Sequence, residues 1–191
     1  MVDSVAFPDE GVILNACCLV NLYASRYFSS ILEALPVPTM VAADIYEHEV
    51  LRVYSEGVGG EGLGHEPIEL QPLLHTGLLV AVSPSSETEM ASAIELAAAS
   101  GEDADAFTAA LALSRHWAIG VDDSKAAAFF RRNAPHLQLL STPQFVRYWT
   151  ERADPSPETV RAALRNIQRY AKYTLPPQHA LHAWWQGYLD G

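Results

Sequence analysis

Short apolar runs that alternate with helical segments constrain the fold of this chain more than any other feature of its sequence. A strand buried on both faces of a parallel sheet reads as an unbroken apolar run, whereas an amphipathic helix repeats its apolar residues at every third or fourth position. Four runs fit the first description, and a helical pattern follows each of them: residues 12–14, 78–82, 117–121 and 137–140. This order predicts an α/β fold, a three-layer α/β/α sandwich with a mainly parallel central sheet.

The same spacing rules predict the helices and the domain boundary. Helices are expected over residues 19–35, 41–54, 87–99, 105–115 and 124–133, and again from residue 142. Five glycines between Ser55 and Pro67 predict a loop. A Ser-Pro-Glu start at positions 156–158 predicts a further helix, which a shorter aromatic helix follows. We expect one domain over residues 1–153, including the glycine-rich loop 55–67, and a helical C-terminal extension over 154–191 packed on it.

Charge and composition exclude several classes of protein. Twenty-three acidic residues against twelve Lys and Arg give the 191-residue chain a formal net charge of −11, so bulk attraction to nucleic acid is excluded. A nuclease is not excluded, because a divalent metal can mask acids locally. No apolar stretch reaches the length of about 18 residues that spans a membrane, and the start resembles no signal peptide. The two adjacent cysteines cannot form a disulfide framework, so we expect a cytoplasmic protein without membrane contact.

Polar residues follow the predicted strands at the edge where a parallel sheet gathers its functional groups. Asn15 follows the first strand, and Asp122 and Asp123 follow the third. Asp105 begins a helix that is otherwise apolar, and Glu49 lies late in another predicted helix. Carboxylates that converge there repel one another unless a cation neutralises them. Oxygen-only ligands select Mg²⁺ or Mn²⁺, and a pair of such ions suits phosphodiester hydrolysis.

Four short motifs then stand in a distinctive order: residues 12–22, Glu49-Val50-Leu51, residues 105–112 and residues 121–126. Together they resemble the motifs of PIN-domain proteins, which include the VapC-like toxin ribonucleases. The resemblance covers about residues 10–150 and implies a small α/β/α sandwich that cleaves RNA with Mg²⁺ or Mn²⁺. It implies catalytic positions at Asn15, Glu49, Asp105 and Asp123, and metal ligands at Glu49, Asp105, Asp122 and Asp123.

The partners that this resemblance implies are an RNA substrate and an antitoxin protein, and a homodimer stays open. Asn15 departs from the family pattern, because its amide is a poorer ligand for a hard cation than the expected carboxylate. A naturally degenerate site, a tolerated variant and a deliberate Asp-to-Asn change that silences a toxic product are three competing explanations.

Three functions follow from these observations. The first is a metal-dependent endoribonuclease, the toxin half of a toxin–antitoxin pair, which Asn15 could silence. The second is a catalytically inactive PIN-like scaffold that binds RNA or a protein. The third is another α/β phosphate-handling enzyme, such as a phosphatase.

Taken singly, the same residues also have structural interpretations: Asn15 can cap a helix, Asp105 can serve as a first-turn acid, and Asp122 and Asp123 can begin the next helix.

A cationic stripe occupies one face of the predicted tail helix. Its members lie four, four and three residues apart: Arg161, Arg165, Arg169 and Lys172. Val160, Leu164 and Ile167 lie on the opposite face. In an acidic chain this stripe could hold an RNA backbone or an acidic partner, and the alternative is an ordinary solvated helix face.

Overall fold

The computed structural model describes residues 6–8, 10–48, 51–56, 63–100 and 103–191. Its centre is a five-stranded sheet in the order β5 (Val80–Val82), β2 (Thr39–Ala42), β1 (Val12–Leu14), β6 (Ala118–Gly120) and β7 (Leu139–Leu140). Every neighbouring pair of strands in this sheet is parallel. The predicted α/β fold with a mainly parallel central sheet is therefore confirmed.

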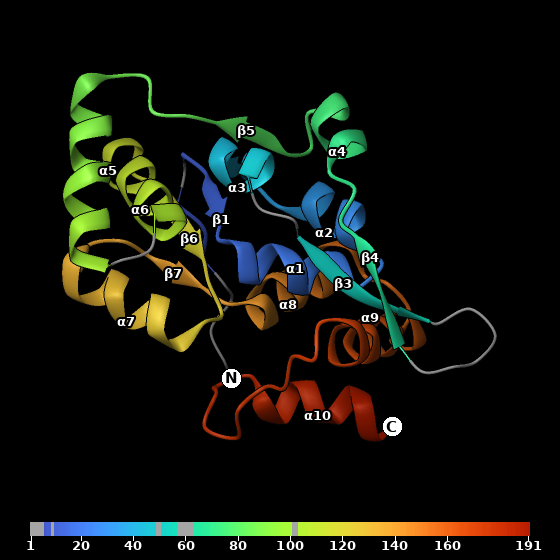
Figure 1. The fold of residues 1–191 in the computed structure, drawn as a ribbon. Coiled ribbons are helices and arrows are strands. Elements are labelled where there is room, and N and C mark those ends of the chain that lie inside the picture. The colour runs from blue at the N-terminus through green and yellow to red at the C-terminus, as the bar shows by residue number, and fades with distance from the viewer. Residues whose placement is uncertain (1–5, 9, 49–50, 57–62, 101–102) are drawn as a thin grey trace.

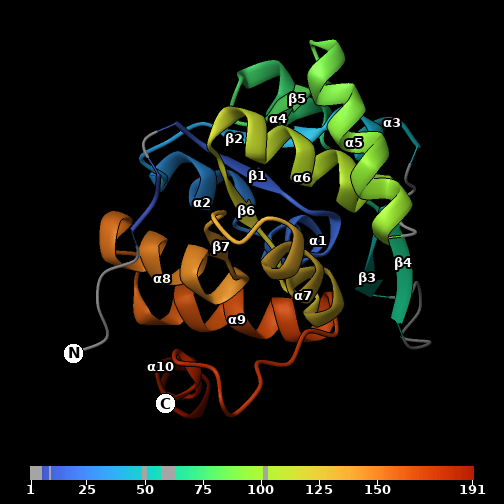
Figure 2. The ribbon, with the colours of Figure 1, turned by 90° about the vertical axis from the view of Figure 1, so that its left-hand side faces the viewer.

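Helices cover both faces of the sheet and complete the three-layer sandwich (Figure 1). One layer contains α1 (Ala16–Ala24), α2 (Phe28–Ala34), α8 (Thr142–Ala153) and α9 (Pro157–Tyr170). The other contains α5 (Glu87–Ser100), α6 (Asp103–Arg115) and α7 (Ser124–Asn133), and Figure 2 shows α6 lying across the front of the sheet. The short helices α3 (Ala43–His48) and α4 (Gln71–Thr76) lie towards the β5 edge, and α10 (His182–Asp190) packs on α9.

The central strand β1 lies at the point where the chain changes direction through the sheet. The connection from β1 to β2 passes through α1 and α2, whereas the connection from β5 to β6 passes through α5 and α6 in the opposite layer. The end of β1 pairs with the end of β6, Leu14 against Gly120, and the backbone N–H of Asn15 donates to the carbonyl of Gly120 at 2.9 Å. In open α/β sheets, ligands bind beyond the carboxyl ends of strands at such a switch point.

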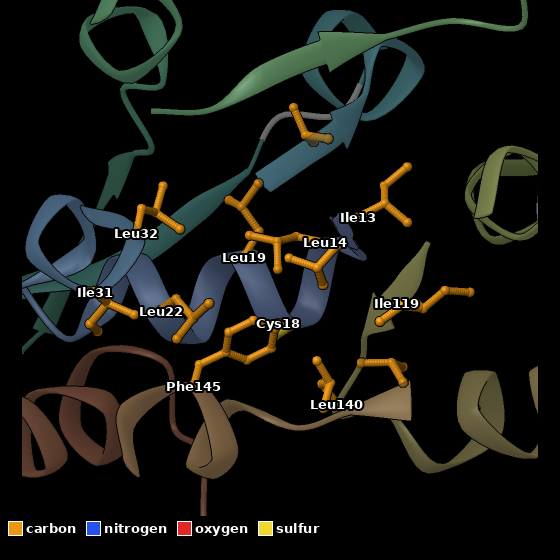
Figure 3. Close-up of a cluster of buried hydrophobic side chains, with 14 of the residues drawn as sticks. Ile13, Leu14, Cys18, Leu19, Leu22, Ile31, Leu32, Ile119, Leu140 and Phe145 are labelled. Carbon is orange, nitrogen blue, oxygen red and sulfur yellow. The ribbon is translucent and has the colours of Figure 1, made fainter. Parts of the chain in front are cut away.

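A hydrophobic core of described residues joins the sheet to the helices of both halves of the chain. Figure 3 shows Leu14, Cys18 and Phe145 meeting in this core. Gly120 lies so close to them that an added Cβ would be 2.7 Å from Cδ2 of Leu14, which only glycine avoids. Residues of the predicted C-terminal extension belong to the same core: Val160, Ala163, Leu164, Ile167, Leu175 and Trp185.

The predicted helix over residues 41–54 is confirmed only over α3 (Ala43–His48) and is wrong for the strand residues on either side of it. The structure places β2, α3 and β3 (Arg52–Glu56) in this region, and all four residues of β2 are buried. Because β2 lies between β1 and β5 with both faces covered, its apolar residues do not alternate with polar ones. A short buried run of this kind cannot be assigned to a helix or a strand by periodicity. Val41 and Ile45 are both buried, but they lie on a strand and on the helix after it.

Two further differences concern turns. The loop predicted over 55–67 is partly a hairpin, because β4 (Leu63–Pro67) pairs antiparallel with β3, and its residues 57–62 lie outside the described residues. The helix predicted over 19–35 is two helices, α1 and α2. Ser25 ends α1, where its hydroxyl donates to the carbonyl of Leu22 and accepts from the N–H of Tyr27, and Arg26 has a φ of 68°.

Among the described residues, no helix has the length and apolar character needed to cross a membrane.

Candidate functional site

Asn15 and Asp105 meet beyond the carboxyl end of β1. Asn15 is the N-cap of α1, and its side-chain oxygen accepts a hydrogen bond from the N–H of Cys17 at 2.9 Å. Its side-chain Nδ2 donates to the Oδ1 of Asp105, which lies in the first turn of α6. Both side chains are buried, with 6% of Asn15 and 8% of Asp105 exposed. The N-cap alternative for Asn15 is confirmed, and the same amide also contacts a buried carboxylate.

This contact changes the electrostatic character of the predicted site. Two carboxyl groups in direct contact would need a shared proton or a cation, whereas the neutral amide of Asn15 offers its N–H to the single carboxyl group of Asp105. A carboxylate that receives a hydrogen bond is stabilised in its buried position. The buried pair therefore contains one acidic side chain rather than two.

Asp122 is bonded to three donors on two helices. Its carboxylate accepts from Nδ2 of Asn21 at 2.9 Å, from the backbone N–H of Thr142 at 2.9 Å and from the hydroxyl of Thr142. Tyr173 lies near the same carboxylate, and burial together with the negative charge of Asp122 raises the pKa of Tyr173. Asp122 thus connects the end of β6 to α1, to the start of α8 and to the C-terminal segment.

Asp123 has a different environment. Its side chain is exposed, and Oδ1 accepts from the N–H of Ala126 at 2.7 Å as the N-cap of α7. The backbone N–H groups of Asp122 and Asp123 both point to Sγ of Cys17 at 3.3 Å, which places Asp123 next to the helix that Asn15 caps. The structure therefore brings Asp123 to the same edge of the sheet as Asn15.

The metal site itself stays a prediction. Glu49 lies outside the described residues. Within the part of the chain that the structure describes, no three side chains of His, Cys, Asp or Glu gather closely enough to hold one ion. Of the predicted ligands, Asp105 contacts Asn15, Asp122 is bonded to Asn21 and Thr142, and Asp123 caps α7.

The two cysteines beside this site have the character of structural residues. Burial raises the pKa of Cys17 to about 11, although the N–H groups of Asp122 and Asp123 act in the other direction. Burial also raises the pKa of Cys18, which is fully buried in the core. Neither thiol is therefore a nucleophile at neutral pH.

The four cations of the tail stripe all have partners within the chain. Arg161 and Arg165 donate to the last carbonyls of α10, those of Tyr188 at 2.8 Å and Leu189 at 3.4 Å. Arg169 forms an ion pair with Glu56 of β3 at 3.0 Å. Nζ of Lys172 lies 4.9 Å from the centre of the ring of Tyr54, which also belongs to β3. The three arginines connect α9 to its neighbours, whereas Lys172 lies beyond the end of α9 at Tyr170 with a φ of 56°, so the predicted helix face does not include it. RNA or partner binding by the stripe stays a prediction.

Asn21 and Thr142 are the site residues that sequence reasoning missed. Asn21 is 6% exposed on α1, and Thr142 is fully buried at the start of α8. A polar residue within the apolar run of residues 16–24 was an available signal, since a buried amide needs a partner.

No family model, no curated protein and no solved structure matches the chain.

Proposed function

We propose that this protein is a PIN-like endoribonuclease in which Asn15 occupies the position of one acidic ligand, so that it binds Mg²⁺ or Mn²⁺ weakly and cleaves RNA slowly. The observation that carries the proposal is the contact between Asn15 and Asp105, which lie ninety positions apart in sequence. It forms at the switch point of the sheet, beside the strand end that bears Asp122 and Asp123.

The chemistry of the donor set fits a hard divalent cation in part. Asp105 and Asp123 supply carboxylate oxygens, the ligands that Mg²⁺ prefers, and Glu49 is the third expected ligand. The side-chain oxygen of Asn15 already accepts from Cys17, and its Nδ2 donates to Asp105. Asn15 therefore directs an N–H, not an oxygen, towards the place where a cation would bind.

When bound, the cation would activate a water molecule and stabilise negative charge on the phosphate. The residues of the chain have separate roles in this proposal. Asp105 and Asp123 would hold the ion, Asn15 would orient Asp105 by its hydrogen bond, and Asp122 would keep the end of β6 in place through Asn21 and Thr142.

A catalytically inactive scaffold that binds RNA is the second candidate. It is favoured by the same hydrogen bond, because a carboxylate that already accepts a hydrogen bond from the amide of Asn15 has less need of a cation. In that case the chain would bind RNA without cleaving it, and introducing a carboxylate at position 15 would not produce cleavage.

Cleavage of a labelled single-stranded RNA by the native chain, by Asn15→Asp and by Asn15→Asp/Asp105→Asn separates the candidates. Mn²⁺ and EDTA are compared for each protein. Asn133→Asp is the matched control, since Asn133 donates to the carbonyl of Phe129 on α7 instead of to an acid. The proposal predicts that Asn15→Asp raises Mn²⁺-dependent cleavage by about tenfold or more, that the double variant loses the gain and that the control has no effect.

If neither the native chain nor Asn15→Asp cleaves RNA with Mn²⁺, and neither binds Mn²⁺, the nuclease proposal is wrong. RNA binding without cleavage by all variants would support the scaffold. Hydrolysis of a small phosphoester without RNA cleavage would indicate a phosphatase. The toxin role is tested separately, by growth arrest on expression of Asn15→Asp and its relief by a co-expressed antitoxin.

A further inference from the structure

A cavity of about 470 Å³ lies between the sandwich and the C-terminal segment. Its walls come from the carboxyl ends of β6 and β7, the helices α7 and α8, and the segment from Tyr173 to Ala180. Asp122 lies in this wall, so the cavity adjoins the candidate site. Its volume falls within the range of small-molecule sites, about 300–1,000 Å³.

One wall of the cavity is a fixed chain of hydrogen bonds. Nδ1 of His179 accepts from the N–H of Leu181 at 3.1 Å, so the proton is on Nε2, which donates to the hydroxyl of Ser141 at 3.1 Å. Ser141 then donates to Oε1 of Gln144 at 2.9 Å. His179 cannot take a proton from Ser141 in this arrangement, so the pair is not a serine nucleophile with its base. Burial also lowers the pKa of His179, which keeps it neutral at pH 7.

Three other polar side chains of the wall are unused within the described chain. Ser124, Arg131 and Gln178 line the cavity, are exposed, and make no side-chain hydrogen bond or ion pair with another described residue. Ser124 and Arg131 lie seven residues apart on the same face of α7, about 10 Å along the helix axis. A hydroxyl, a guanidinium and an amide therefore line one cavity.

The chemistry of these groups favours a phosphorylated nucleoside. A guanidinium binds phosphate through two parallel hydrogen bonds, and Arg131 has no acid in the described chain to compete for it. Tyr173 and Pro176 provide an aromatic and an apolar surface against which a base can stack. Ser124 and Gln178 offer donors and acceptors for the sugar and the base.

We propose that this cavity binds one nucleotide of an RNA strand, with its phosphate on Arg131 and its base against Tyr173. This inference rests on the proposed function, since it gives the endoribonuclease a subsite for a nucleotide next to the cleavage site. The C-terminal segment would then contribute to substrate specificity, because it supplies Tyr173, Pro176 and Gln178.

Titration of the full chain with AMP, GMP, CMP and UMP, with ribose 5-phosphate and inorganic phosphate as comparisons, tests the subsite. EDTA is present throughout, so the measurement is independent of the metal site. Arg131→Ala is compared with Arg132→Ala, which removes the same charge from the next position of α7 and does not line the cavity. We expect a nucleoside monophosphate to bind, Arg131→Ala to weaken binding by about tenfold or more, and Arg132→Ala to change it less than about twofold.

No saturable binding of any nucleoside monophosphate would overturn the inference, as would equal affinity for inorganic phosphate or equal loss in the two arginine variants. The outcomes are distinguishable from those of the cleavage experiment. Nucleotide binding without RNA cleavage by Asn15→Asp would leave the subsite standing and remove the proposed activity. RNA cleavage that Arg131→Ala leaves unchanged would support the proposed activity and remove the nucleotide subsite.

Discussion

The side-chain amide of Asn15 donates a hydrogen bond to the carboxylate of Asp105 at the carboxyl end of the central strand. The donor also caps α1, and the acceptor lies in the first turn of α6 on the opposite face of the sheet. One neutral side chain thus holds the two helix starts together and supplies the hydrogen bond that a buried carboxylate needs.

Replacing this amide with an acid is expected to destabilise the metal-free protein. Asn15→Asp keeps the helix cap, because Asp also accepts from the N–H of Cys17, but it places a second carboxylate against Asp105. We expect a loss of about 2 kcal/mol in the free energy of unfolding. Urea unfolding in EDTA measures it. The swapped variant Asn15→Asp/Asp105→Asn restores an amide–carboxylate pair and should recover most of the loss; no recovery would contradict the role given to this bond.

The two adjacent acids at positions 122 and 123 are expected to differ in their effect on stability. Asp122→Ala removes the acceptor of Asn21 and of both donors of Thr142, and we expect a loss of about 3 kcal/mol. Asp123→Ala removes only an exposed helix cap, for which about 1 kcal/mol is expected. Thermal or urea unfolding of the two variants compares them. Equal losses would show that the network around Asp122 does not stabilise the fold.

Acid is expected to weaken the contact between α5 and α6. Hydrogen bonds from Arg115 lower the pKa of Glu89 from 4.5 to about 2, and Glu89 is 4% exposed. The carboxylate of Glu89 is therefore protonated less readily in the folded state than in the unfolded state. The stability that this lowered pKa contributes is present above pH 4.5 and is lost as the pH falls towards 2, by about 1–2 kcal/mol because solvent near the surface screens the pair.

Glu89→Gln should remove this part of the pH dependence, measured as the free energy of unfolding between pH 7 and pH 3. Glu151→Gln is the control, because Glu151 pairs with Arg147 on the surface of α8, where ion pairs contribute little. An unchanged pH profile in Glu89→Gln would show that the pair does not act in this way.

The cysteines are expected to resist modification in the native protein. A pKa of about 11 leaves Cys17 roughly a hundredfold less thiolate at pH 8 than an ordinary thiol with a pKa of 9.0. The rate of reaction with a disulfide reagent at pH 8 should therefore be slow in buffer and fast in urea. Rapid native labelling of either cysteine would contradict the buried geometry.

Two glycine substitutions should have opposite effects. Gly120→Ala would press a Cβ to 2.7 Å from Leu14 and 3.2 Å from Phe145, and overpacking of this kind costs about 1–3 kcal/mol. Gly187 lies within α10 with nothing within 4 Å of its added Cβ, so Gly187→Ala should stabilise the protein by about 0.5–1 kcal/mol. Paired melting curves compare the two; stabilisation by Gly120→Ala would show that the core adjusts at this point.

Local signals were sufficient where a helix has its own cap and an amphipathic pattern. The sequence predicts a helix over residues 124–133, which are the bounds of α7, and Asp123, one of the two acids that could begin this helix, caps it. The same signals failed at β2, since a strand with both faces buried lacks alternation. The β3–β4 hairpin was missed because its glycine-rich sequence has no strong strand pattern.

The sequence by itself determined the alternation of four of the five central strands with helices and the positions of polar residues at strand ends, because apolar periodicity and helix starts are local properties. Only the tertiary structure decided which polar groups meet. Contacts between distant segments bring the amide of Asn15 to Asp105 and bond Asp122 to Asn21 and Thr142. They also leave Asp123 as the cap of α7 and place Arg131 in the wall of a cavity. Such contacts form because buried polar groups need partners, and the order of strands in the sheet selects which partners are within reach.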